Sequence, residues 1–128
     1  MWKREEPYLT WQPPLVSAGA YTVRCEDWAG GTLCVQVQPT AGGEVLELRW
    51  EEVCSCQVTQ EECRKDWWRL HTAEPWAFWR SEDSGFLRDF CRENALYPEK
   101  LTHFVVAGTN QILDVLAPGE PVVRRMPG

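Results

Sequence analysis

Two apolar runs near the end of the chain constrain the fold more than any other stretch. Residues 104–107 and 112–116 are apolar at nearly every position, and the short segment 108–110, Gly-Thr-Asn, separates them. Two such runs around a turn signal of this kind predict a β-hairpin. Neither run alternates with polar residues, so both faces of the hairpin are expected to be buried. The sequence therefore places this hairpin at the centre of the core.

Three stretches upstream alternate between apolar and polar residues. They span residues 20–28, 32–38 and 44–51, and turns that contain paired glycines join them. Alternation with a period of two predicts strands that have one buried and one solvated face. Short turns between such strands predict an antiparallel meander. Residues 53–58 either continue the third strand after a bend or form a fourth strand.

Phe86, Leu87 and Phe90 recur at helical spacing behind the cap-forming and acidic residues 81–84. This pattern predicts a helix near residues 82–94 that packs these three side chains on the sheet.

A second helix near residues 60–70 would begin with a capping box, Thr59-x-x-Glu62. The adjacent Trp67 and Trp68 favour a strand or a loop instead. Both interpretations stay open.

Together these elements predict an α+β fold. A mainly antiparallel sheet, the meander plus the C-terminal hairpin, carries one or two short helices and either stays open or curls into a sandwich or half-barrel. A length of 128 residues fits a single domain, 1–128. Residues 1–14, interrupted by prolines, predict an arm or a short edge strand. Residues 76–79 and 122–123 predict two further short strands.

Composition narrows the class of partner and the compartment. The net charge of −6 argues against a nucleic acid partner and suits a basic protein partner or plain solubility. No apolar run approaches the ~18 residues of a membrane span, so no membrane contact is expected. The first residues lack the apolar stretch of a secretion signal. If no signal segment was removed, the chain is expected to be cytoplasmic, with its six cysteines as free thiols.

Cys54, Cys56, Cys63 and His71 are the candidate metal ligands. Closed zinc sites usually combine two C-x2–4-C pairs, whereas this chain has one C-x-C pair and no second pair. We therefore expect thiols without a metal, and no other cofactor, because no calcium loop, phosphate-binding loop or dinucleotide fingerprint occurs.

His103 and Asp114 are the residues of the central hairpin that could carry chemistry. An unpaired buried carboxylate is costly, so Asp114 should face solvent, bond to a turn, or pair with an arginine such as Arg88 or Arg124. We expect structural roles for both residues.

Four tryptophans, Trp67, Trp68, Trp76 and Trp79, lie within thirteen residues. Trp76 and Trp79 are expected in the core. The neighbours Trp67 and Trp68 would point to opposite faces of a strand, so one of them is expected at the surface, where large aromatic side chains often bind partners.

Two function hypotheses follow. In the first, the protein is a non-enzymatic cytosolic interaction module, of the kind that neutralises a toxin, and exposed tryptophan with an acidic rim occludes a basic partner. The partner-binding residues would be Trp67, Trp68, Glu51, Glu52, Glu61 and Glu62. In the alternative, the protein binds a small molecule or is an enzyme, with a pocket formed by His103, Asp114, Trp76 and Trp79. We expect no catalysis; the sequence does not specify the partner, the ligand or the oligomeric state.

Several segments occur together in a familiar order: Leu48-Arg-Trp50-Glu-Glu-Val53, Gln57-Val-Thr59-x-Glu61, Trp76-x-Phe78, His103-Phe-Val-Val106-x-Gly-Thr109-Asn110 and Asp114-Val-Leu116. The chain resembles, over roughly residues 45–123, a group of small uncharacterised bacterial proteins that end in a His-aromatic strand, a Thr-Asn turn and an Asp-Val-Leu strand. This resemblance implies no activity and no functional residues. In size, charge and aromatic content the chain is also similar, in general character, to toxin-immunity proteins.

Overall fold

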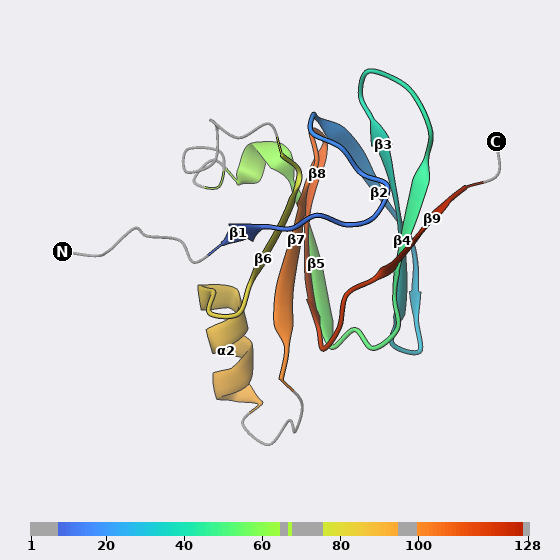
Figure 1. The fold of residues 1–128 in the computed structure, drawn as a ribbon. Helices are drawn as coiled ribbons and strands as arrows, with labels where there is room; N and C mark the ends of the chain where they lie inside the picture. Colours follow the sequence, from blue (N-terminus) through green and yellow to red (C-terminus); the bar gives the residue numbers. More distant parts are fainter. Residues whose placement is uncertain (1–7, 65–66, 68–75, 95–99, 127–128) are drawn as a thin grey trace.

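The computed structural model describes residues 8–64, 67, 76–94 and 100–126. Two antiparallel sheets pack face to face (Figure 1). The first contains, in spatial order, β1 (Leu9–Thr10), β6 (Phe78–Ser81), β7 (Thr102–Ala107), β8 (Gln111–Ala117) and β5 (Ser55–Gln60). The second contains β2 (Tyr21–Ala29), β3 (Thr32–Pro39), β4 (Leu46–Trp50) and β9 (Val122–Arg125). The described helices are α2 (Gly85–Glu93) and a 3-10 helix, η1 (Glu61–Cys63).

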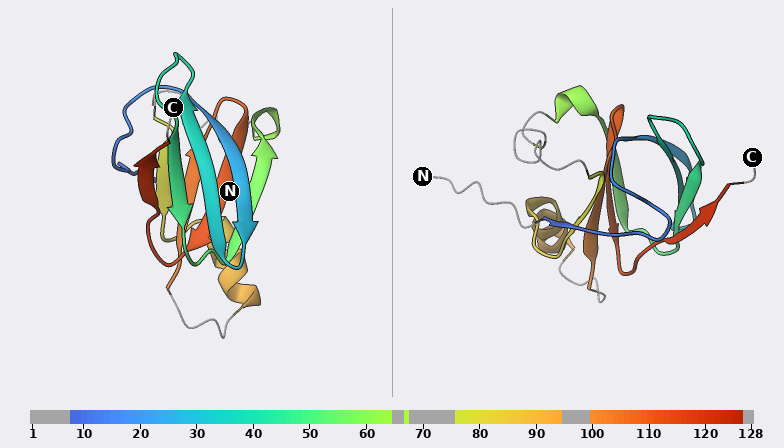
Figure 2. Two further views of the ribbon diagram at one scale, coloured as in Figure 1. Left: turned by 90° about the vertical axis from the view of Figure 1, so that its right-hand side faces the viewer. Right: turned by 45° about the horizontal axis from the view of Figure 1, so that its top comes forward.

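The predicted C-terminal hairpin is confirmed as β7 and β8, which pair from Thr102↔Ala117 to Ala107↔Ile112. On the inner face, Phe104 and Val115 join the core between the two sheets, where Trp50 and Phe78 are fully buried. On the outer face, the side chain of Trp67 and the helix α2 pack on the hairpin, and Figure 2 shows α2 on this side of the sheet. Its strands are therefore buried on both faces, which explains why their sequence does not alternate.

The meander β2–β3–β4 is confirmed, but it does not share a sheet with the hairpin. After Trp50 the chain leaves the second sheet: the Val53 N–H donates to the Gly31 carbonyl, and β5 then pairs with β8 in the first sheet. Residues 53–58 thus supply a separate strand rather than an extension of β4. The predicted sheet is split in two, and the result is a sandwich.

The turn between β7 and β8 ties the two sheets together. The Asn110 side chain accepts a hydrogen bond from the Val23 N–H at 3.0 Å and donates one to the Val23 carbonyl at 2.9 Å. The Thr109 N–H donates to the Tyr21 carbonyl at 2.8 Å. A Cβ at Gly108 would lie 2.5 Å from Val23 Cγ2, so only glycine allows this close approach. We call residues 108–110 the clasp.

The helix predicted near residues 82–94 is confirmed as α2. Ser84 is its N-cap, with a side chain that accepts a hydrogen bond from the Leu87 N–H, and Phe86, Leu87 and Phe90 pack toward the sheet. Of the helix considered near residues 60–70, the structure describes mainly η1, whose N-cap is Gln60 without a side-chain capping bond. Thr59 lies in β5 instead, so of the two open interpretations the capping box at Thr59 does not form.

The edge elements also follow the prediction. β1 forms a short edge strand within residues 1–14, and β9 forms the edge of the second sheet. Among the described residues, no helix has the length and apolar character needed to cross a membrane.

Candidate functional site

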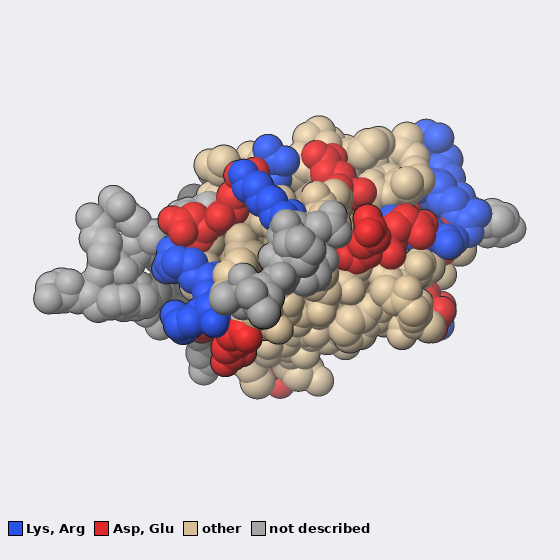
Figure 3. All heavy atoms as spheres, turned by 90° about the horizontal axis from the view of Figure 1, so that it is seen from below, with Lys and Arg blue, Asp and Glu red and all other residues tan. Residues whose placement is uncertain are grey.

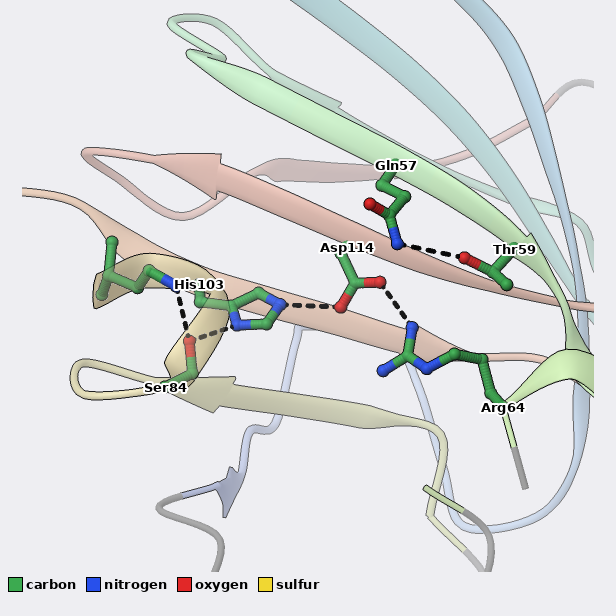
Figure 4. A network of polar contacts seen from close by, with 7 residues as sticks. Gln57, Thr59, Arg64, Ser84, His103 and Asp114 are labelled. Carbon is green, nitrogen blue, oxygen red and sulfur yellow. Dashed lines mark hydrogen bonds and ion pairs between the residues drawn. The ribbon is translucent and has the colours of Figure 1, made fainter. Parts of the chain in front are cut away.

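A chain of polar contacts lies on the outer face of the first sheet (Figure 4). Ser84 Oγ is 2.6 Å from His103 Nδ1, and His103 Nε2 is 2.7 Å from Asp114 Oδ1. The Arg64 guanidinium donates to Asp114 Oδ2, also at 2.7 Å. The chain joins the N-terminus of α2, the two central strands and the residue that follows η1. We call these four residues the polar chain.

One arrangement of protons satisfies the contacts of the three buried members of the polar chain. His103 Nε2–H donates to Asp114, and His103 Nδ1 accepts from the Ser84 hydroxyl, whose oxygen accepts from the Leu87 N–H. Asp114 receives its second bond from Arg64. Fully satisfied buried networks of this kind rigidify a core.

The expected arginine partner of Asp114 therefore exists, but it is Arg64 rather than Arg88 or Arg124. Arg88 pairs with Asp83, and Arg124 pairs with Glu47 on the other sheet. The two hairpin residues do lie together, as the pocket hypothesis required.

The polar chain differs from an active site because its side chains are shielded from solvent. A serine, a histidine and an aspartate in series are the groups of many hydrolases. Here Ser84, His103 and Asp114 are only 0%, 1% and 3% exposed. The rings of Tyr8 and Phe86 lie 5.5 and 5.0 Å from the His103 ring. A substrate could reach these groups only after the covering layer moved, so the geometry favours a structural role.

The tryptophan cluster is largely core. Trp79 is buried, as predicted, and Trp67 packs against it with ring centroids 5.9 Å apart. Trp76 is half-buried and donates from its indole N–H to the Trp11 carbonyl. Trp67 is 4% exposed and therefore offers no contact surface in this structure. Trp68 lies outside the described residues, so the expectation that one of this pair is exposed stays a prediction.

A groove of about 270 Å³ lies over β2 and β3, away from His103 and Asp114. The predicted tryptophan-lined pocket does not coincide with it. The groove is lined by Thr22, Val23, Arg24, Gln36, Val37, Gln38, Val45 and Asn110.

The predicted acidic stretch is divided in space. Glu51 and Glu52 follow β4, whereas Glu61 and Glu62 lie in η1, after β5. The six residues of β5 separate the two pairs, and a strand of that length spans about 20 Å. Glu51 is also neutralised by Arg49 at 2.8 Å. Viewed from below, acidic and basic side chains intersperse over the surface (Figure 3). The four glutamates therefore lie as two pairs, one before and one after β5, and their role in partner binding stays a prediction.

The cysteines are free thiols. Among the described residues, no group of three or more cysteine, histidine or acidic side chains could hold a metal ion. His71, one of the four candidate ligands, lies outside that part of the chain, so the absence of a metal stays a prediction. Cys25 on β2 and Cys56 on β5 both pack against the core between the sheets. Burial and, to a smaller extent, the Cys25 thiol raise the pKa of Cys56 to about 11.

The four sheet edges differ in a way that the sequence analysis missed. Native sheets block their edges with short strands, prolines, charges or covering segments. The edge strand β1 has only two residues, and β9 carries Arg124 and Arg125. The clasp covers β2 at Tyr21 and Val23, and the rest of that strand carries the charges of Glu26 and Asp27 and a register shift between Cys25 and Asp27. The fourth edge strand, β5, has the sequence Ser-Cys-Gln-Val-Thr-Gln, without charge, proline or glycine.

The backbone groups on the free side of β5 can be assigned from the hydrogen bonds around it. The Glu61 N–H donates to the Asn110 carbonyl, so the odd-numbered residues of β5 bond to β8. The Gly108 N–H donates to the Gln111 carbonyl, so the odd-numbered residues of β8 bond to β7. The even-numbered residues of β8 are then the ones that bond to β5, in agreement with the first assignment. Cys56, Val58 and Gln60 therefore direct their N–H and C=O groups to the free side.

Exposed apolar side chains lie on the same side of the sandwich as this edge. Val58 pairs with the core residue Leu113 but is 43% exposed, and Trp28 pairs with the core residue Leu33 but is 47% exposed. Both residues belong to edge strands, and half-buried Cys25 and Cys56 lie near each other between those strands. Within the described part of the chain, β8 is the one strand that pairs with β5, so its free side combines open backbone groups with the exposed side chain of Val58. The uncharged sequence of residues 55–60 already carried this signal.

No family model matches the chain, and no match was found among curated proteins or solved structures. The resemblance to small bacterial proteins therefore stays a prediction, and the function must be argued from the geometry alone.

Proposed function

We propose that this protein is a non-enzymatic interaction module that binds a partner strand along the free side of β5. The observation that carries the proposal is the contrast among the four edges: three are short, charged or covered, and β5 is none of these. An uncharged six-residue strand with open backbone groups is a template for strand addition.

Main-chain hydrogen bonds from Cys56, Val58 and Gln60 would supply the affinity of such a complex. Specificity in strand addition comes from the side chains beside the added strand. Val58 is exposed on β5 itself and Trp28 on the edge strand β2 of the other sheet, and tryptophan is enriched among the residues that dominate binding energy. Trp28 thereby takes the role that the sequence suggested for Trp67 and Trp68.

The proposal has three more specific parts: the partner is basic, the role is to neutralise a toxin, and the location is the cytoplasm. The net charge of −6 supports the first two, because it would attract a basic protein over long range. Six free thiols support a reducing compartment.

Capture of partners from the native host with two matched variants tests the proposal. Val58→Lys places a charge on the β5 edge, and Val122→Lys places the same charge on the β9 edge, where Val122 is 63% exposed. We expect the first variant to lose the captured protein and the second to keep it. Equal capture by both variants would contradict the assignment of β5. Circular dichroism of both variants establishes that the fold is retained.

A second candidate function, a hydrolase, rests on the Ser84–His103–Asp114 series alone. Its test is the hydrolysis of activated esters by the wild-type chain and by Ser84→Ala. A rate above the buffer rate that the variant loses would favour it. Equal rates for the wild type, the variant and buffer would eliminate ester hydrolysis by this series.

A further inference from the structure

We propose that the strand that adds to β5 is β5 of a second copy of this chain. The inference rests on the proposed strand addition at β5 and replaces the basic foreign partner by a second copy of the chain. The two strands would pair antiparallel about a two-fold axis at Val58. The two five-stranded sheets would then join into one continuous sheet.

The positions of the free backbone groups carry this inference. Cys56, Val58 and Gln60 point outward and are evenly spaced about Val58. In an antiparallel pair centred there, Val58 lies opposite the second copy's Val58, and Cys56 lies opposite the second copy's Gln60. Opposed residues of this type exchange both of their hydrogen bonds, so each outward N–H meets an outward carbonyl. The pattern is self-complementary, as a two-fold interface requires.

The side chains of β5 fit the same symmetry. A two-fold axis brings identical residues together, so a charge near the axis would repel its own copy. β5 carries no charge, and its axial residue would be an apolar valine. On the outer face, Gln57 would lie opposite the second copy's Thr59; these two polar side chains already hydrogen-bond within one chain. The pairing therefore buries no charge and opposes no like charges.

Pairing with a second copy leaves no open strand edge at the interface, which favours it over pairing with a foreign strand. Adding a foreign strand to β5 leaves that strand's far edge open for further pairing, whereas self-pairing consumes both β5 edges. β5 also lies at the margin of the molecule, beyond β2 of the other sheet (Figure 2). The second sheet thus leaves the free side of β5 accessible, and self-pairing would cover the exposed Val58.

Sedimentation equilibrium over a range of chain concentrations tests the inference. We expect a reversible dimer for the wild type and for Val122→Lys. Val58→Lys would place two lysines on the axis, and like charges in an interface cost several kcal/mol, so its dissociation constant should rise at least ~100-fold.

Two double variants test the register. Gln57→Lys with Thr59→Glu places opposite charges across the axis and should retain the dimer. Gln57→Glu with Thr59→Glu places like charges there and should weaken it at least tenfold, because opposed like charges are destabilising. Equal dissociation constants for the two double variants would overturn the register.

A wild-type chain that stays monomeric at the highest soluble concentration would overturn self-pairing altogether. This failure is distinct from failure of the proposed function. A monomer that captures a foreign protein through Val58, and loses it in Val58→Lys but not in Val122→Lys, would leave β5 as the interaction edge and replace only the occupant.

Discussion

The polar chain and the β5 edge are opposite in character. The polar chain contains the residue types that sequence reasoning associates with chemistry, yet its serine, histidine and aspartate are buried and satisfied by one another. The β5 edge contains one thiol of raised pKa, Cys56, and no other group that could react, yet Val58 is exposed and the backbone of Cys56, Val58 and Gln60 faces its free side. Residue type alone would place function at the first region, whereas the function proposed above uses the second because it is accessible. Accessibility decides, because a partner can bind only what it reaches.

Removal of the buried carboxylate should give the largest effect. Asp114→Ala leaves His103 and Arg64 without their shared acceptor, and breaking a buried pair costs about 3–5 kcal/mol. Urea denaturation should show a loss of this size in the free energy of unfolding. Asp89→Ala, which removes an exposed carboxylate from α2, should change it by less than ~0.5 kcal/mol. Equal losses in both variants would show that the polar chain does not stabilise the fold.

The β5 side makes a prediction about thiol reactivity. Since the pKa of Cys56 is raised to about 11 from 9.0, its thiolate fraction at pH 8 should be about a hundredfold below that of an ordinary thiol. Only the thiolate reacts, and reactivity should recover as the pH rises toward 11. Alkylation followed by peptide mapping should therefore label the exposed Cys63 and Cys91 first. Labelling of Cys56 at the same rate would show that its site is more open than described.

The clasp covers the beginning of the β2 edge, at Tyr21 and Val23, and Gly108→Ala tests how tightly it packs there. The new Cβ would meet Val23 Cγ2 at 2.5 Å and the Gln111 carbonyl oxygen at 2.9 Å. Overpacking of this kind costs about 1–3 kcal/mol, which thermal denaturation can measure. Gly119→Ala is the control, because its Cβ would meet no atom within 4 Å. A Gly108 variant as stable as this control would rule out a tight clasp.

The smallest expected effect concerns Ser84. Ser84→Ala removes the helix cap and the contact with His103, and loss of an N-cap side chain costs about 1 kcal/mol. Glu82→Ala, at an exposed site two residues earlier, is the control. A Ser84 variant that keeps its stability but loses an activity would move the function back to the polar chain.

The sequence predicted the elements better than their assembly. The apolar runs of the hairpin, the alternation of the meander and the spacing of Phe86, Leu87 and Phe90 are local patterns, and each was confirmed. Whether residues 53–58 extend β4 or cross to β8 depends on contacts between residues far apart in the chain. Periodicity carries no information on such contacts.

The candidate site shows the same limit. The sequence singled out His103 and Asp114, but Ser84 entered only as a helix-cap residue and Arg64 not at all, because their contacts span 19 and 50 residues. The prediction of an exposed tryptophan assumed that Trp67 and Trp68 lie in a strand. Trp67 instead packs against Trp79 on the outer face of the first sheet. The uncharged sequence of β5 was visible from the start. That sequence suggests a binding edge only once the structure shows that β5 is an edge strand.

Hydrogen exchange along β5 tests the central claim most directly. In dilute protein, the amide protons of Cys56, Val58 and Gln60 should exchange rapidly, whereas those of Gln57 and Thr59, bonded to β8, should exchange slowly. Bound partner, or high chain concentration if the partner is a second copy, should slow exchange at Val58. Slow exchange at Val58 in the dilute chain, equal to that at Thr59, would show that this edge is already covered and would contradict the account.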